Sequence, residues 1–216
     1  MRDARGMFVG TLAAIQRYPV KSLRPQALDG ARIERDGIPG DRTEALFVRA
    51  GAQRVGKTYR GKENDRLHLI SETSDARDAA AGRGVDVEVR GGERFFDAAP
   101  ISLVIDCWLD ALSRHVGYAV EWQRFRPNFF VRGGGNFALL ESALVGATLS
   151  IGHANFAVRS PILRCVVPTY DPYSSGKDPA VLRFIANERE NVMGIYCDVV
   201  APGEVRVGDA VVRSDA

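Results

Sequence analysis

Cys165 is the residue of this sequence whose type and neighbours most suggest chemistry. It lies in PILRCVVP, residues 161–168. Taken alone, a cysteine flanked by leucine and valine more often packs as a small buried hydrophobe. Arg164 precedes it, however, and a guanidinium that lies close in space favours the thiolate, the form of cysteine that binds metals. Cys107 and Cys197 lack such neighbours, and we expect both to be structural.

Two pieces of the N-terminal half carry residue types that bind phosphate. The segment YPVKSL, residues 18–23, contains Lys21 and Ser22, and GDR, residues 40–42, ends in Arg42. Lysine offers a point charge and arginine a two-pronged donor, so the three side chains can converge on one anion. The signal is weak by itself, because exposed basic residues near turns are usually solvated.

A third piece, RFRPN at residues 124–128, carries two arginines and Asn128. Arg126 and Asn128 offer planar donors and an amide, which suit the edge of a heterocycle. A basic strand end explains these residues equally well, and both interpretations stay open at this point.

The composition excludes several classes of protein. Twenty-nine basic and 27 acidic residues give a net charge of +2, too balanced for a typical nucleic-acid binder. The one basic cluster, residues 49–66, contains acidic residues as well, so we expect a solvated loop with room for one anionic group. No apolar run is long enough to cross a bilayer, and residues 1–10 lack the apolar core of a signal peptide. We therefore expect a cytoplasmic protein with no membrane or nucleic-acid partner.

The three cysteines form no CxxC pair, which argues against a disulfide framework and against a structural zinc site. Apolar and alternating stretches predict many short strands separated by glycine-rich turns, and this pattern favours a closed, barrel-like sheet. The predicted strands are residues 7–15, 45–48, 85–89, 119–125, 128–131, 148–151, 156–158, 165–169, 195–200 and 204–212.

Two helices are expected among these strands. Between residues 101 and 116, apolar side chains recur at three- and four-residue spacing after Pro100, which is a favourable residue in a first helical turn. A shorter helix should follow Pro179. Its apolar face would hold Val181, Leu182 and Ile185.

In sequence order, these pieces resemble the MOSC family, named after the C-terminal domain of molybdenum cofactor sulfurase. IQRYPVKSL (15–23) with GDR resembles the N-terminal barrel segment that accompanies MOSC domains. FRPN, LSIG, Arg164-Cys165, Asp171-Pro172 and GEVRVGDAVV resemble the MOSC domain itself. The resemblance implies a mostly β (α+β) fold with a few helices. A smaller N-terminal β-barrel-like domain would span residues 1–98 and the MOSC β-barrel residues 99–216, with molybdopterin in the cleft between them.

The resemblance also implies roles for individual residues. In the amidoxime-reducing members of the family, such as the mitochondrial amidoxime-reducing component, the cysteine that matches Cys165 ligates molybdenum. The residues that match other contacts of the molybdenum–molybdopterin cofactor are Lys21, Ser22, Arg42, Ser102, Arg126, Asn128 and Arg164. Ser102 would stand at the expected helix start, where free N–H groups suit an anion. We expect all eight residues to line one pocket.

The function implied is that of an oxidoreductase that reduces N-hydroxylated or N-oxide small molecules, with the cofactor performing the redox step. The sequence has no cysteine run for an iron–sulfur cluster, so electrons would come from a separate donor protein. Two alternatives stay open: a sulfur carrier that uses Cys165 as a persulfide, and a cofactor-binding or storage module without turnover. Lys21, Ser22, Arg42 and Arg126 favour roles that include the cofactor, since a persulfide carrier needs no phosphate site.

Overall fold

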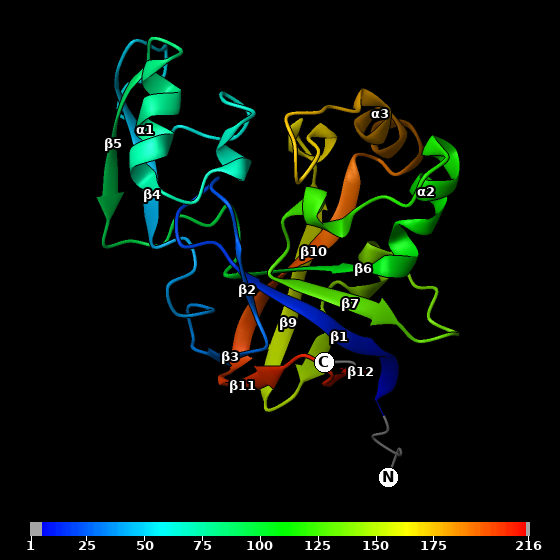
Figure 1. The fold of residues 1–216 in the computed structure, drawn as a ribbon. Helices are drawn as coiled ribbons and strands as arrows, with labels where there is room; N and C mark the ends of the chain where they lie inside the picture. Colours follow the sequence, from blue (N-terminus) through cyan, green and yellow to red (C-terminus); the bar gives the residue numbers. More distant parts are fainter. Residues whose placement is uncertain (1–5, 215–216) are drawn as a thin grey trace.

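Seven strands of the described chain close into a barrel, drawn in Figure 1. The computed structural model describes residues 6–214. The strands of the ring, in order, are β12 (Ala210–Ser214), β8 (Thr148–Ile151), β9 (Ala154–Leu163), β10 (Val192–Ala201), β6 (Ile101–Ile105), β7 (Phe129–Gly133) and β1 (Met7–Arg17). Antiparallel pairing of β1 with β12 closes the ring, and β2 (Gln26–Leu28) extends it beside β1. The mostly β fold expected from the sequence is confirmed.

Alternating side chains of these strands fill the barrel. In β8 and β9, buried and less buried positions alternate, as in a sheet with one face on a core. Phe129 and Phe156 meet inside the barrel with their rings edge to face, 5.5 Å apart. Leu12 and Ile15 of β1 belong to the same core, so the N-terminal strand is part of the barrel wall.

Two helices lie side by side near the upper end of the barrel in Figure 1: α2 (Asp110–Val116) and α3 (Pro179–Glu188). The rings of His115 and Phe184 pack between them at 4.9 Å. The Asp178 side chain caps α3 by accepting a hydrogen bond from the backbone N–H of Ala180, and Pro179 occupies the first turn. The predicted helix after Pro179 is therefore confirmed, with Val181 and Ile185 on its buried face.

A smaller unit stands apart from the barrel in Figure 1. There β4 (Glu44–Ala50) pairs antiparallel with β5 (Asp86–Gly91), and α1 (Thr73–Ala81) contributes Ala76 and Ala80 to a separate small core. A two-stranded sheet with one helix thus takes the place of the predicted second barrel. Another two-stranded sheet pairs β3 (Gly30–Ile33) with β11 (Gly203–Arg206). The domain boundary at residue 99 stays a prediction. β1 lies before this boundary in the sequence but pairs with β7 and β12, which lie after it.

The predicted helix over residues 101–116 is wrong in its first half. Residues Ile101–Ile105 form β6, a short 3-10 helix η2 (Asp106–Trp108) follows, and α2 begins only at Asp110. Every residue of β6 is buried, since β6 lies between β10 and β7 within the barrel wall. A strand that is buried on both faces has a nearly continuous apolar sequence, and the spacing of its apolar residues does not distinguish it from a buried helix.

Two predicted strands are also absent. Residues 119–125 contain the 3-10 helix η3 (Trp122–Phe125), where the indole of Trp122 stacks on Phe130 at 4.7 Å. Residues 165–169 contain the 3-10 helix η5 (Val167–Thr169), with Pro168 in its first turn. The fixed φ of proline suits a helical turn and withholds a donor from a sheet, so Pro168 outweighs the β-branched neighbours. The remaining 3-10 helices are η1 (Leu67–Leu69) and η4 (Glu141–Leu144).

Residues 1–5 lie outside the described part of the chain. They make up half of residues 1–10, the segment whose sequence lacks the apolar core of a signal peptide. Among the helices of residues 6–214, none combines the length and the apolar character needed to span a membrane.

Candidate functional site

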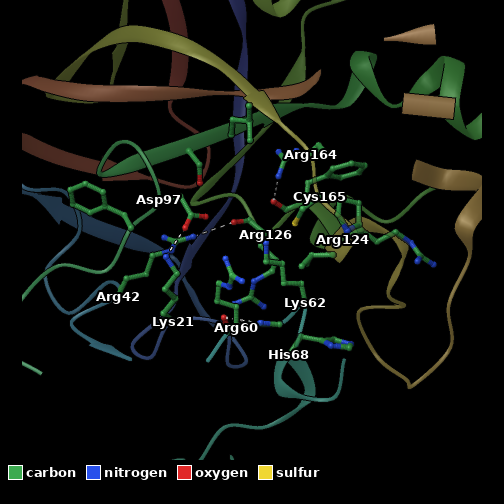
Figure 2. A pocket seen from close by; sticks show the side chains of 18 of the residues that line it. Lys21, Arg42, Arg60, Lys62, His68, Asp97, Arg124, Arg126, Arg164 and Cys165 are labelled. Atoms are coloured by element: carbon green, nitrogen blue, oxygen red, sulfur yellow. Dashed lines mark hydrogen bonds and ion pairs between the residues drawn. The ribbon is translucent and has the colours of Figure 1, made fainter. Parts of the chain in front are cut away.

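A cavity of about 350 Å³ is lined by residues of the smaller unit and of the barrel. All eight residues singled out by the sequence line it: Lys21, Ser22, Arg42, Ser102, Arg126, Asn128, Arg164 and Cys165. In Figure 2, Lys21, Arg42 and Asp97 lie on one side, Arg164 and Cys165 lie on the other, and Arg126 lies between them. The expected convergence on one pocket is thus observed, while the role of each residue stays a prediction.

Two arginines of the cavity lie against the ring of Tyr18, the first residue of the YPVKSL segment. The guanidinium carbons of Arg42 and Arg126 lie 4.5 and 4.4 Å from the ring centroid. The ring is fully buried, and its hydroxyl can donate to Oε1 of Gln16 at 2.6 Å or to the Pro127 carbonyl at 3.1 Å. Burial raises the pKa of Tyr18 to about 12, so the ring stays neutral between its two cations.

Arg42 is held in place by two neighbouring side chains of the cavity wall. Its Nη1 donates to the Asp41 carboxylate at 2.5 Å and to Oδ1 of Asn128 at 3.2 Å, and Asp41 is only 3% exposed. Asp41 also accepts a hydrogen bond from the Tyr18 backbone N–H at 2.7 Å. Burial would lower the pKa of Arg42, but the charge and hydrogen bond of Asp41, together with Tyr18 and Asp97, outweigh burial and leave the pKa raised. Arg42 therefore anchors the wall of the cavity.

Asn128 and Ser102 join two barrel strands beneath the cavity. Oδ1 of Asn128 accepts from the backbone N–H of Ser102 at 3.1 Å and from its hydroxyl at 3.0 Å, while Nδ2 donates to the Gln16 carbonyl at 3.2 Å. Asn128 is 1% exposed. The helix start expected at Ser102 is wrong, because Ser102 lies inside β6 and its N–H is already bonded. Both residues position the cavity floor.

Lys21 and Ser22 enter the cavity from the segment that follows β1. The Lys21 ammonium lies 2.5 Å from the carboxylate of Asp97, which is 72% exposed. Although the Asp97 side chain reaches solvent, the surrounding protein desolvates its carboxylate, which would raise the pKa; Lys21 and the nearby arginines outweigh this effect and hold the pKa of Asp97 below its usual value. The Ser22 hydroxyl accepts a hydrogen bond from the backbone N–H of Gly61 at 3.2 Å, which links this segment to the loop around residue 60.

Backbone strain gathers at the site. The non-glycine residues of the described chain with positive φ are Ser22, Arg42, Arg126, Glu190 and Asn191. The first three line the cavity, and Asn191 holds Arg164 in place. Non-glycine residues in this conformation cost free energy and persist only where surrounding contacts enforce them, so the contacts around the cavity hold its backbone in a strained arrangement.

Cys165 lies between the end of β9 and η5, on a segment fixed at both ends. The backbone N–H of Arg164 donates to the Asn191 carbonyl and the Asn191 amide donates back to the Arg164 carbonyl, both at 2.8 Å. On the far side, the Thr169 hydroxyl donates to the Val166 carbonyl at 2.7 Å. Cys165 itself is exposed. The chain thus presents one thiol to the cavity from a rigid support.

The Arg164 guanidinium turns inward beneath this segment. It donates to the carbonyls of Met193 at 2.6 Å and Phe125 at 2.9 Å, and its Nη2 is buried with no partner in the described structure. Burial lowers the pKa of Arg164 to about 10, which still leaves it charged at neutral pH. Gly194 makes room for it: a Cβ there would lie 2.9 Å from Nη2 of Arg164, at a φ of +90°.

The other two cysteines differ from Cys165. Cys197 is 1% exposed within β10, and burial strongly raises the pKa of its thiol. Cys107 is half-buried, and burial together with Asp106 raises its pKa to about 11. Both agree with the structural role expected for them.

The cavity carries an excess of positive charge. Asp97 is the one carboxylate among its lining residues, against the cations Lys21, Arg42, Arg60, Lys62, Arg124, Arg126 and Arg164. In the described residues, Lys62, Arg126 and Arg164 have no carboxylate partner, whereas Arg60 pairs with Glu63 and Arg124 with Glu121. Three uncompensated cations in one concave surface favour an anionic ligand.

Arg60, Lys62, Asp97 and Tyr196 are among the further lining residues of this cavity that were not expected there from the sequence. Arg60 and Lys62 belonged to the basic cluster interpreted as a solvated loop with room for one anion. Asp97 and Tyr196 lie outside the sequence motifs that suggested a binding site. Tyr196 lies on β10 opposite Ser102, and burial raises the pKa of its hydroxyl.

Comparisons with known proteins bear on the fold and the family. Residues 88–212 match the family described as MOSC domain. The crystal structure of the YuaD protein from Bacillus subtilis has 20% sequence identity and a TM-score of 0.59, covering 96% of this chain and 97% of its own. A hypothetical protein of known structure has 15% identity and a TM-score of 0.51, covering 98% of this chain and 69% of its own. No curated protein matched. At these identities the two structures support the fold alone, whereas the family match spans more than half of the sequence. The chain therefore belongs to the MOSC domain family.

Proposed function

We propose that this protein is a molybdenum-cofactor-dependent oxidoreductase that reduces N-hydroxylated or N-oxide small molecules, with Cys165 as the protein ligand of molybdenum. MOSC domains are in general associated with the molybdenum cofactor. The observation that carries the proposal is the placement of an exposed thiol in the same cavity as three cations without carboxylate partners. A soft metal with an anionic organic group attached needs both features.

The donor set of the cavity fits such a cofactor. Among the described residues, no three His, Cys, Asp or Glu side chains gather closely enough to hold a metal ion by themselves. A metal at Cys165 would therefore take most of its ligands from a cofactor, as the dithiolene sulfurs of molybdopterin provide. The unpartnered Nη2 of Arg164 is a buried donor that the protein leaves unsatisfied, which is costly unless another group accepts from it.

The residues of the cavity would bind different parts of the cofactor. Lys21, Lys62 and Ser22 would hold the cofactor phosphate, because they combine point charges with a hydroxyl on one wall. Arg126 and Arg164, both fixed by bonds to backbone carbonyls, would orient the pterin. When bound, the cofactor supplies two-electron chemistry and oxygen-atom transfer.

The chain itself would supply protons and electrostatic support. The Tyr196 hydroxyl stays protonated at neutral pH and can donate a proton into the cavity. Asp97 stays ionised and keeps Lys21 oriented. Three separated cysteines cannot hold an iron–sulfur cluster, so we propose that a separate protein delivers the electrons.

The experiment compares Cys165→Ser with Lys21→Gln in protein made in a host that synthesises molybdopterin. Serine offers a harder and less acidic ligand, so Cys165→Ser should lose reductase activity and retain most of the pterin. Lys21→Gln should lose pterin, and activity in proportion. Bound pterin is measured by fluorescence after oxidation, and activity with a reduced dye. Wild-type reduction by Cys165→Ser would show that Cys165 is not the ligand.

A sulfur carrier is the alternative that one observation favours, since the thiol is exposed on a loop that another protein could reach. Such a carrier would lose function in Cys165→Ser and be unaffected by Lys21→Gln. The same pair of variants therefore separates the two functions, with persulfide formation at Cys165 as the additional measurement.

A further inference from the structure

A second cavity of about 180 Å³ adjoins the first. The two share His68, Arg124, Arg126, Val167 and Tyr170 as lining residues. Val167 follows Cys165 by two positions, so this second cavity opens beside the segment that carries the thiol. A ligand there could reach the main cavity without occupying the anion-binding wall at Lys21.

Apolar side chains and two aromatic rings form much of the second cavity: Pro25, Ala27, Val167, Pro172 and the rings of Tyr170 and Tyr173. The Tyr170 ring is fixed, because it stacks on His68 at 5.7 Å and carries the Lys177 ammonium 5.5 Å from its centroid. His68 is fixed in turn, since its Nε2 donates to the Asp171 carbonyl at 2.7 Å. The fixed ring of Tyr170 and this volume suit a planar group of one or two rings.

Among the three arginines that line the second cavity, Arg24 is the one whose side chain makes no hydrogen bond or ion pair with another described residue. Arg124 is engaged by Glu121 at 2.8 Å, and Arg126 donates to the Leu23 carbonyl at 2.6 Å. Arg24 is exposed; only its backbone N–H is bonded, to the Ile70 carbonyl at 2.8 Å, and its guanidinium has no partner among residues 6–214. A guanidinium free to donate two parallel hydrogen bonds favours a carboxylate.

We propose that the second cavity is the substrate subsite and that it takes a planar aromatic group bearing an acidic substituent. The acidic substituent would bind Arg24, and the reducible N–OH group would face the main cavity on the Cys165 side of Val167. This proposal rests on the proposed function, because it names the substrate class of that reaction. It adds a preference for acidic aryl substrates to the general class of N-hydroxylated compounds.

The test uses benzamidoxime and its 4-carboxy derivative as paired substrates. In each, the N–O bond breaks, the amidoxime takes two electrons from reduced methyl viologen and two protons from solvent, and the oxygen leaves as water to give the amidine. Wild-type protein should show a kcat/KM about tenfold higher for the carboxylated compound, the effect of one charge-assisted hydrogen bond. Because Arg24 is exposed, this preference should shrink as salt is added.

The variants are Arg24→Gln and the matched control Arg66→Gln. Arg66 is also exposed, lies on neither cavity and has no side-chain partner in the described structure. Arg24→Gln should lower the ratio of the two kcat/KM values about tenfold, while Arg66→Gln should keep the wild-type ratio. An unchanged ratio in Arg24→Gln would overturn the subsite.

A binding measurement separates this proposal from the proposed function. Calorimetry on the full chain without cofactor should give a Kd for the carboxylated compound that rises about tenfold in Arg24→Gln. If no protein reduces either compound but the Kd still depends on Arg24, the proposed function fails and the binding site stands. If reduction proceeds and neither the Kd nor the ratio depends on Arg24, the subsite fails and the proposed function stands.

Discussion

Replacing Arg42 by alanine should destabilise the fold as well as the cofactor site. Arg42 is 16% exposed and Asp41 only 3%, and their side chains are 2.5 Å apart. Removing one partner of a buried ion pair leaves the other charge uncompensated, at a cost of about 3–5 kcal/mol. The Tyr18 N–H still donates to Asp41 at 2.7 Å, so we expect the lower part of this range, about 3 kcal/mol. For a chain of 216 residues this lowers the Tm by about 6–12 °C.

Thermal denaturation of the cofactor-free protein, followed by circular dichroism, measures this change. Lys62→Gln is the matched control, since Lys62 lines the same cavity but is exposed and its side chain has no hydrogen bond or ion pair within residues 6–214. Its free energy of unfolding should stay within about 0.5 kcal/mol of wild type. Arg42→Lys keeps the positive charge but loses the guanidinium group that bonds Asp41 and Asn128. Its Tm should therefore lie between those of Arg42→Ala and Lys62→Gln. An Arg42→Ala protein with a wild-type Tm would refute the structural role of this pair.

Three further predictions concern other parts of the site. Iodoacetamide at pH 8 should label Cys165 alone in the folded protein, because the other two thiols are less exposed and have raised pKa values; peptide mapping that finds equal labelling of all three would contradict this. Burial raises the pKa of Tyr18 to about 12, so the unfolded chain releases this proton first, and stability is lost as pH rises from about 10 towards 12. Urea unfolding across that range should show a shallower loss in Tyr18→Phe, and an identical slope would be inconsistent with the buried phenol. Gly194→Ala should cost about 1–3 kcal/mol more than Gly146→Ala, since both glycines have a positive φ but only Gly194 has close neighbours; equal urea midpoints would refute it.

Much of the site was predictable because its residues occur in short motifs. Lys-Ser, Gly-Asp-Arg, Arg-Pro-Asn and Arg-Cys lie far apart in sequence, yet all reach one cavity. The motifs did not reveal which members face a ligand. The sequence around Asn128 and Arg42 does not tell whether these side chains bind a cofactor or each other. The hydrogen bond between them at 3.2 Å shows that they also form the wall of the cavity.

The fold was predictable where one face of a strand meets solvent, as in β8, whose predicted bounds match the observed ones. It was mispredicted where tertiary packing buries both faces, as in β6, or where one proline ends a β-branched run, as at η5. The helix α1 was missed because its inward residues, Ala76 and Ala80, give a weak apolar stripe. Arg60 and Lys62 were placed in a solvated loop, since nothing in their local sequence shows that Ser22 holds the loop at the cavity.

X-ray absorption at the molybdenum edge shows whether Cys165 ligates molybdenum. Protein made in a molybdopterin-competent host should contain molybdenum with two dithiolene sulfurs and one thiolate sulfur. Cys165→Ser, loaded in the same way, should lose one sulfur from the metal and gain one light-atom neighbour. The same sulfur count in both proteins, or a wild-type protein that takes up no molybdenum, would contradict the account.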